Sequence, residues 1–429
     1  MKKLFFLMAA TACMASASAL PVETQNPAAE QSRIPQRVVV VSGDTAKMRP
    51  EVVAVIYDSN DIKFHDPSAP RFLFLDRKGK IAFGIGGYIY ATAAYNFGGS
   101  ERTGSDFIPS QLPTPADPTE RAALQFTARH STIFFQLAGH SDKLGAYSAF
   151  IQTNFDDSRN RFMKLEQAYL KVGDVTAGLT RTTFQDPASV PTVDTQGPCG
   201  EVDRKNVHLQ YAPQFNEHWS GAIAVEDPHA MINNGDFTQS ISQRVPDIPV
   251  YVQYSWGNGN HVRASAMLRN LCYRDPRVSK VNYTQGYGVQ LSGVSSLGAG
   301  FTLFASTVYG RGITSYITDL SSYNLDLIPS ATTPGKLVAP QVFSYNLGLR
   351  YDFCSKGFAT LAWGQAILGD RGDLGLDTYR QGIYASANVF YTIFDDCLVG
   401  LEYARGQRTN FSGEHGSGNR IMAAVRYSF

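Results

Sequence analysis

The sequence is poor in charge, and the charge that it has is balanced. Only 17% of the 429 residues are charged, whereas about a quarter is usual in a soluble domain. The 38 Lys and Arg residues face 37 Asp and Glu residues. Because this balance gives no reason to expect a basic surface for phosphates, no nucleic acid is expected among the partners.

Long apolar runs and metal-binding motifs are also missing. After the first 19 residues, no apolar run reaches the roughly 18–20 residues that a membrane helix needs. The five cysteines and eight histidines show no spacing typical of a zinc site, and no cofactor is expected. Glycine and aromatic residues are plentiful, which excludes a disordered chain and a coiled coil. The length then leaves two or three soluble domains or one large β-barrel.

The first 19 residues resemble a secretory signal peptide. Lys2 and Lys3 precede an apolar stretch at Leu4–Ala12, and Ala17–Ala19 forms a small-residue cleavage site. Cys13 offers the alternative of a lipoprotein cysteine, although the apolar stretch before it is short. A signal peptide without a later apolar helix leaves a secreted or periplasmic protein, or an outer-membrane barrel.

The C-terminal tail alternates between two kinds of side chain. One parity carries Ile421, Ala423, Val425, Tyr427 and Phe429, and the other carries Arg420, Met422, Ala424, Arg426 and Ser428. Such a period of two is typical of a lipid-facing strand, although a sandwich strand can show it too. A terminal aromatic residue resembles the signal that outer-membrane barrels present to their assembly machinery, so that machinery is an expected partner through Phe429.

The same alternation recurs in about sixteen segments, each near the length that a tilted membrane strand requires. They lie near 81–94, 122–137, 143–155, 161–172, 174–182, 204–212, 217–226, 248–256, 260–271, 281–294, 298–309, 341–353, 356–367, 379–393, 397–405 and 418–429. Tyr, Phe and Trp at the segment ends suit the aromatic girdles of a membrane barrel. An even number of strands leaves no open edge in lipid.

Short turns and long connections alternate between these segments. The long ones lie at 95–121, 183–203, 227–247, 272–280, 310–340, 368–378 and 406–417. Short periplasmic turns and long extracellular loops are typical of bacterial outer-membrane barrels. The expected fold class is therefore all-β: a sixteen-stranded antiparallel transmembrane β-barrel of the bacterial outer membrane, in contact with lipid and lipopolysaccharide.

Residues 20–80 do not follow this pattern. The stretch 20–36 is rich in Pro, Ala and Gln, 38–41 and 52–57 resemble short strands, and 71–87 resembles a hairpin. We expect a periplasmic extension, or a plug lying in the lumen, ahead of a barrel domain at 81–429.

Two stretches resemble the DcaP-like porins of Gram-negative outer membranes. The first runs from Phe64-His65-Asp66-Pro67 to Gly84-Ile85-Gly86-Gly87-Tyr88. The second runs from Ala177-Gly178-Leu179-Thr180-Arg181 through Phe184-Gln185-Asp186 and Pro191-Thr192-Val193-Asp194 to Gly197-Pro198-Cys199-Gly200. Leu179 and Arg181 depart from the Gln and Trp that are usual there.

The resemblance implies sixteen strands, a homotrimer, and diffusion of small anionic or dicarboxylate solutes through a constriction. An inward-folded third loop would form that constriction, and 183–203 is its equivalent here. The loop contains Asp186, Asp194 and Glu201, and Pro and Gly residues that would shape it. A mobile surface loop is the alternative for the same residues.

Basic side chains dominate the parities that should face the lumen. Pore lining and solute binding are expected of Arg129, Arg181, Arg204, His208, Arg263, Arg269, Arg350, Arg380 and Arg426. Such residues lower the entry energy of anions, and the planar guanidinium fork matches a carboxylate. Several of these arginines could instead lie at rims, pair with loop acids or hold the loop in place.

The four cysteines of the mature chain allow two disulfides by their expected sides, Cys199–Cys272 and Cys354–Cys397. The second pair would start about three strands apart, which is too far for a bridge without movement. The sequence leaves both pairings open.

The sequence therefore predicts a porin, not an enzyme, that passes small hydrophilic, anionic solutes by diffusion. A basic wall opposite an acidic loop would orient the solute. One alternative is a structural or adhesive barrel with a closed lumen, motivated by the long loops and by Arg371-Gly372-Asp373. A secreted soluble β-protein is a further alternative.

Overall fold

A computed structural model describes residues 38–43, 48–56, 64–66, 69–99, 106–117, 119, 121–155, 163–193, 198–257, 259–394 and 396–429. The expected signal peptide at 1–19, and Asp194 of the predicted constriction loop, lie outside these residues. Within the described part of the chain, no helix combines the length and apolar character needed to cross a membrane.

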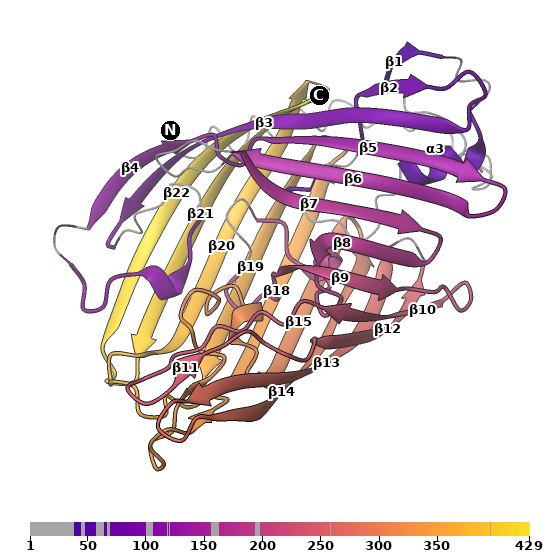
Figure 1. Cartoon of the computed structure of the whole chain (residues 1–429). Coiled ribbons are helices and arrows are strands. Elements are labelled where there is room, and N and C mark those ends of the chain that lie inside the picture. The colour runs from indigo at the N-terminus through magenta and orange to yellow at the C-terminus, as the bar shows by residue number, and fades with distance from the viewer. Residues whose placement is uncertain are drawn as a thin grey trace, which may run out of the picture.

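Sixteen antiparallel strands close into one barrel (Figure 1). β4 and β5 both pair with β3 and form two halves of a single barrel strand, and β22 pairs with β3 to close the ring. The strands are β3 (Ile81–Phe97), β4 (Ala122–Thr127) with β5 (Thr132–Ser141), β6 (Gly145–Phe155), β7 (Met163–Val172), β8 (Val175–Arg181), β9 (Lys205–Tyr211), β10 (Trp219–Glu226), β12 (Ile248–Trp256), β13 (Asn260–Asp275), β14 (Lys280–Gly298), β15 (Phe301–Arg311), β18 (Gln341–Cys354), β19 (Gly357–Leu368), β20 (Tyr379–Phe394), β21 (Cys397–Asn410) and β22 (His415–Ser428).

Alternation along the strands separates two surfaces, as the sequence predicts. On β22, Ile421 and Val425 are exposed on the outside, whereas Arg420 and Met422 are buried on the inside. A register shift interrupts β20 between Tyr379 and Gln381. The prediction of a sixteen-stranded antiparallel barrel is confirmed.

The connections are short at one end of the barrel and mostly long at the other. Two connections expected to be long are short hairpin turns, at 276–279 and 411–414, because β13, β14, β21 and β22 extend farther than predicted. The long connections carry short elements of their own: η2 (Pro109–Gln111), η4 (Pro187–Ser189), β11 (Gln239–Ser240), η5 (Thr314–Tyr316), β16 (Ile328–Pro329) and β17 (Leu337–Val338).

The N-terminal elements β1 (Val39–Ser42), α3 (Pro50–Ile56) and β2 (Phe72–Leu75) lie at the short-turn end (Figure 1). The prediction of a strand at 52–57 is wrong for 52–56, which is the greater part of α3. The β-branched residues favoured a strand, but a helix lets Val52, Val53 and Ile56 pack together on the wall residues Ala82 and Ala138.

Apolar side chains from three long connections form a core inside the barrel. Phe107 and Leu112 come from the first connection, Phe184 from the third, and Tyr316 and Leu320 from the one after β15. They pack on inward-facing wall residues, among them Met267, Val308, Val342 and Tyr384. Burying this apolar surface holds the three connections within the lumen.

The four cysteines of the described chain are free thiols, so neither possible disulfide forms. Cys199 is buried on β19, where a side chain on Gly364 would meet its carbonyl. Cys272 is buried on β13 and faces the Ser242 carbonyl at 3.5 Å. The two thiols lie in different packing sites and do not bond to each other.

Candidate functional site: the lumenal constriction

The connection 183–203 folds inward along the barrel wall and is called the constriction loop here. Its first half is fixed at Asp186. The Asp186 carboxylate accepts a hydrogen bond from Ser292 at 2.6 Å and contacts His261 Nε2 at 2.9 Å. Arg263 donates to the Gln185 carbonyl at 3.1 Å and lies 3.9 Å from Asp186 Oδ1.

The second half of the loop follows the wall from β18 to β20 and back. Asn388 donates to the Thr192 carbonyl at 2.9 Å, and Ser344 donates to the Gly200 carbonyl at 2.9 Å. Two glycines make room for it, because a Cβ on Gly348 would lie 2.4 Å from Pro191 and one on Gly364 2.1 Å from the Cys199 carbonyl. The loop is therefore seated on the wall by shape as well as by hydrogen bonds.

Asp186 and Glu201 of the loop point to the wall rather than across the lumen. Burial would raise the pKa of Asp186, but Arg263 and the hydrogen bonds from His261 and Ser292 lower it to about 2. Glu201 is buried too, with the Gln185 amide 3.4 Å away. These carboxylates anchor the loop and leave little negative charge facing water.

Several arginines expected in the pore are paired with carboxylates. Arg129 binds Asp106 at 2.7 Å, Arg350 binds Asp352 at 2.6 Å, and Arg181 binds Asp66 at 2.5 Å. Arg263 lies against the constriction loop, as described above. Pairing of this kind fixes segments of the chain and removes part of the positive charge.

Two further arginines of the inner wall make hydrogen bonds to neutral groups. Arg204 donates to the Asn206 side chain at 2.8 Å and to the carbonyls of Ser315 and His229. Arg408, which was not among the predicted residues, donates to the Ser110 carbonyl at 2.8 Å and contacts the Asn410 side chain. Both side chains are only half-buried.

Arg380, His208 and Arg426 complete the predicted set. Arg380 is exposed, because the register shift beside Tyr379 interrupts the alternation of β20. His208 is buried on the inner face of β9. Arg426 donates to the Phe64 carbonyl at 2.8 Å. Among the described residues, no group of three or more His, Cys, Asp or Glu side chains could hold a metal ion.

The sequence of the barrel matches a known protein family. A family model described as porin subfamily matches residues 80–418. The chain belongs to this porin family. No curated protein sequence matches the chain. The resemblance to DcaP-like porins is confirmed, and the protein is an outer-membrane channel of a bacterium.

Solved structures share the fold of this porin. The outer membrane channel DcaP of Acinetobacter baumannii aligns with a TM-score of 0.71 and 18% identity, over 83% of this chain and 99% of that one. An anion-selective porin from Comamonas acidovorans aligns at 0.54 with 11% identity, over 82% and 100%. OmpT of Vibrio cholerae aligns at 0.52 with 11% identity, over 83% and 100%. By the general rule for such barrels, the short-turn end faces the periplasm.

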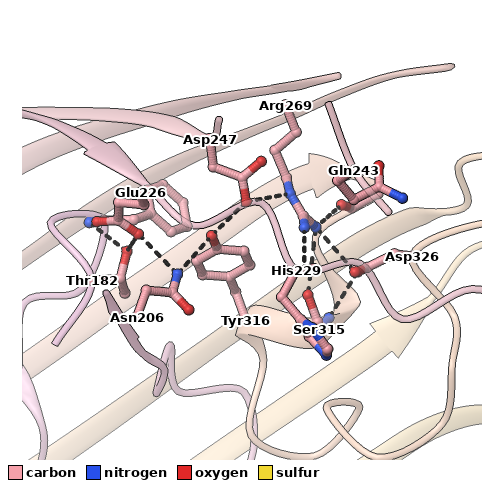
Figure 2. A network of polar contacts seen from close by, with 12 residues as sticks. Thr182, Asn206, Glu226, His229, Gln243, Asp247, Arg269, Ser315, Tyr316 and Asp326 are labelled. Atoms are coloured by element: carbon pink, nitrogen blue, oxygen red, sulfur yellow. Dashed lines mark hydrogen bonds and ion pairs between the residues drawn. The ribbon is translucent and has the colours of Figure 1, made fainter. Parts of the chain in front are cut away.

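A second inward connection of the porin, 312–340, is held by a buried network (Figure 2). The Arg269 guanidinium on β13 lies 3.0 Å from Asp247 and 3.1 Å from Asp326, and all three side chains are fully buried. It also donates to the carbonyls of Gly312 at 2.6 Å and His229 at 2.9 Å. Arg269 therefore joins two long connections to the wall and does not contact the pore water.

The network continues to the base of the constriction loop (Figure 2). Tyr316 donates to Asp247 at 2.8 Å, and Asn206 donates to the Tyr316 hydroxyl and to Glu226. Glu226 also accepts from the Thr182 hydroxyl at 2.8 Å and the Thr183 amide at 2.7 Å. The two inward connections are thus linked through Asn206, which bonds to Tyr316 of one and to Glu226 at the base of the other.

Sequence reasoning missed Asp247, Asp326 and Glu226 in this role. The available signal was a fully charged Arg269 at an inward position, which requires a carboxylate partner if it is buried. The partners lie in connections 22 and 57 residues away in the chain, and no local pattern links them to Arg269.

Proposed function

We propose that this porin passes small hydrophilic solutes by passive diffusion and prefers anions. The observation that carries the proposal is the difference in exposure between two acids of the constriction loop and two arginines of the lumen. Asp186 and Glu201 are 1% and 2% exposed, whereas Arg204 and Arg408 remain half-buried and donate to neutral groups. Of these four charged groups, the two that reach water are therefore both positive.

A positive lumen favours anions because it lowers their energy on entry and replaces part of the lost hydration. Arginine adds a planar donor fork that matches a carboxylate. This proposal keeps the basic wall expected from the sequence but gives the loop acids an anchoring role. The field that orients a solute then comes from the arginines rather than from an opposed acidic loop.

Ion selectivity provides the test. The reversal potential of the purified protein would be measured in a planar bilayer across a KCl gradient. The wild type should be anion-selective, and Arg204→Gln with Arg408→Gln should move the reversal potential toward the cation side. Arg405→Gln, at an exposed position of β21 facing outward, is the matched control and should change nothing. A cation-selective wild type would contradict the proposal.

We further propose that the porin is a homotrimer. The OmpT structures of Vibrio cholerae with the same fold include one described as a trimer. On the outer face, Ala149, Leu170, Ala177 and Leu209 form one continuous row across β6 to β9. The two alanines of this row are small enough to allow close packing of barrels. Ala177→Trp should shift the assembly to monomers on native gels, whereas Leu361→Trp on β19 should leave it intact.

Lipid, lipopolysaccharide and the assembly machinery remain proposed partners. Phe429 pairs with Gly87 by two backbone hydrogen bonds of 2.8 and 2.9 Å and so completes the closure of the barrel. Removing Phe429 should lower the amount of folded porin in the outer membrane.

The closed-lumen barrel is retained as the second candidate, because the apolar core of three connections fills part of the lumen. Its adhesive motif gains little support from the fold. Arg371 is turned back on the Leu374 carbonyl, and a side chain on Gly372 would meet the Pro329 carbonyl. Folded protein without any conductance would favour this candidate over the porin.

A further inference from the structure

We propose that Phe64–Asp66 forms a plug tip that narrows the lumen from the periplasmic side. This inference rests on the proposed function only in taking the lumen as a path for anions. The tip precedes residue 80, where the match to the porin family begins. It therefore lies outside the matched part of the chain.

The chain before the tip covers an inner face of the barrel mouth. Ala82 of β3 and Ala138 of β5 are both buried at inward positions, and α3 packs on them through Val52, Val53 and Ile56. Gln136, which shares that inward parity on β5, donates to the Val55 carbonyl at 3.2 Å. The helix thus lies on the lumenal side of the wall where the wall reaches the periplasm.

The tip itself touches four strands of the barrel wall. The Phe64 ring packs on Phe390 and Phe358, with centroids 4.9 and 5.8 Å away, and the Arg426 guanidinium lies 4.6 Å above it. Tyr88, at an inward position of β3, donates to the His65 carbonyl at 2.5 Å. These contacts fix the tip on β3, β19, β20 and β22.

On its other side the tip meets the constriction. His65 Nε2 lies 3.1 Å from the Val193 carbonyl of the constriction loop. The Asp66 carboxylate lies 2.5 Å from the Arg181 guanidinium, and both side chains are largely buried. Arg181 ends the strand from which the constriction loop starts. The tip therefore bridges the loop and the opposite wall.

Pro70, which follows the tip, packs closely over two glycines of β3. A Cβ on Gly84 would lie 2.5 Å from the Pro70 side chain, and one on Gly86 would lie 2.9 Å from its backbone. Both glycines occupy inward positions of β3, where any side chain would block the return path. The path of the chain therefore accounts for Gly84, whereas Gly86 also makes room for the Phe134 ring, which would lie 2.6 Å from a Cβ there.

The chemistry of the tip resembles that of the proposed solutes. Asp66 places a carboxylate on one wall arginine, and Phe64 places a carbonyl and a ring on another. When an anion enters from the periplasm, Arg181 and Arg426 are therefore already bound by the tip. The docked tip thus narrows the lumen sterically and lowers its positive charge, and both effects end when it leaves.

Single-channel recording on the full-length protein tests the tip. Phe64→Ala and Asp66→Ala should each raise the unit conductance or the open time at least twofold, and the double variant should exceed both. Glu51→Gln, an exposed acid in the first turn of α3, is the matched control and should behave as the wild type. Heat-modifiable gel migration would show that each barrel has folded.

A charge exchange separates docking from a general loss of structure. Asp66→Arg alone should open the channel, and Asp66→Arg with Arg181→Asp should return it toward the wild-type conductance. Equal conductance in the wild type and all tip variants would overturn this inference and leave the porin intact. If neither the wild type nor any folded tip variant conducted ions, both this inference and the proposed function would be overturned.

Discussion

Arg263 on β13 and Asp186 in the constriction loop lie 3.9 Å apart, between Nη1 and Oδ1, and both side chains are buried. The sequence places one on a basic wall and the other on an acidic loop. The fold brings them into contact, with His261 and Ser292 completing the site. A charge expected to act on the solute therefore acts on the position of the loop.

Acid should release this anchor. The folded pKa of Asp186 is lowered to about 2 from 3.8, so its contribution of roughly 2 kcal/mol is complete above about pH 4 and is lost as the pH falls toward 2. Asp186→Asn should lower the thermal stability near neutral pH and flatten this part of the pH profile. Circular dichroism melts at several pH values would measure both effects.

The control for this prediction is Asp377→Asn, an exposed acid in the connection 369–378. It should melt and respond to acid as the wild type does. An Asp186→Asn profile that keeps the full acid response of the wild type would show that other groups carry it.

The second inward connection should depend on the guanidinium of Arg269 and not on its charge alone. Arg269→Lys keeps the charge, but three ammonium donors cannot reach the acceptors on Asp247, Asp326, Gly312 and His229. Breaking a buried pair typically costs about 3–5 kcal/mol. Chymotrypsin should then cut near Tyr316 and Tyr323 in intact vesicles, where the wild type resists.

Arg274→Lys gives a matched comparison, because Arg274 is an exposed residue of the same strand. It should remain resistant. If Arg269→Lys were as resistant as the wild type, the network would not be what holds 312–340 in the lumen.

The barrel is predictable from the sequence because its signal is local. Each strand alternates with period two, since one face meets lipid and the other meets the lumen. Sixteen segments found in this way match sixteen strands. Two of the errors in the barrel fall where the alternation is interrupted, at the break between Thr127 and Thr132 and at the register shift beside Arg380.

The lumen is less predictable because its contacts join distant parts of the chain. Asp66 and Arg181 are separated by 115 residues. Asp326, which pairs with Arg269 of β13, lies in the connection after β15, two strands farther along the chain. Periodicity reports which side of the wall a residue faces but not which loop reaches it. The sequence therefore predicted a basic inner face and could not say which arginines the loops would neutralise.

The glycines under the constriction loop give a third prediction. A Cβ on Gly364 would lie 2.1 Å from the Cys199 carbonyl, so Gly364→Ala should push the loop off the wall and into the lumen. We expect a lower unit conductance at unchanged barrel stability. Trp363→Phe, on the outer face of the same strand, should conduct normally. An unchanged conductance for Gly364→Ala would mean that the loop does not limit the pore.

Acid should also weaken the plug tip, through His65. Burial, with His130 and Arg426 nearby, lowers the pKa of His65 to about 3 from 6.5, although Asp66 and the Val193 carbonyl oppose this shift. His130 in turn faces Asp106 at 3.6 Å. A released tip binds a proton more readily than a docked one. Docking therefore loses up to about 1.4 kcal/mol for each pH unit below about 6.5.

The open time of the channel should accordingly rise when the periplasmic side is brought from about pH 7.5 to about pH 5, where the loss reaches roughly 2 kcal/mol. His65→Asn should remove this response, because the side chain no longer titrates. His218→Asn, at an exposed periplasmic turn, should keep it. Acid activation that persists in His65→Asn would assign the response to another group and leave His65 as a packing residue of the tip.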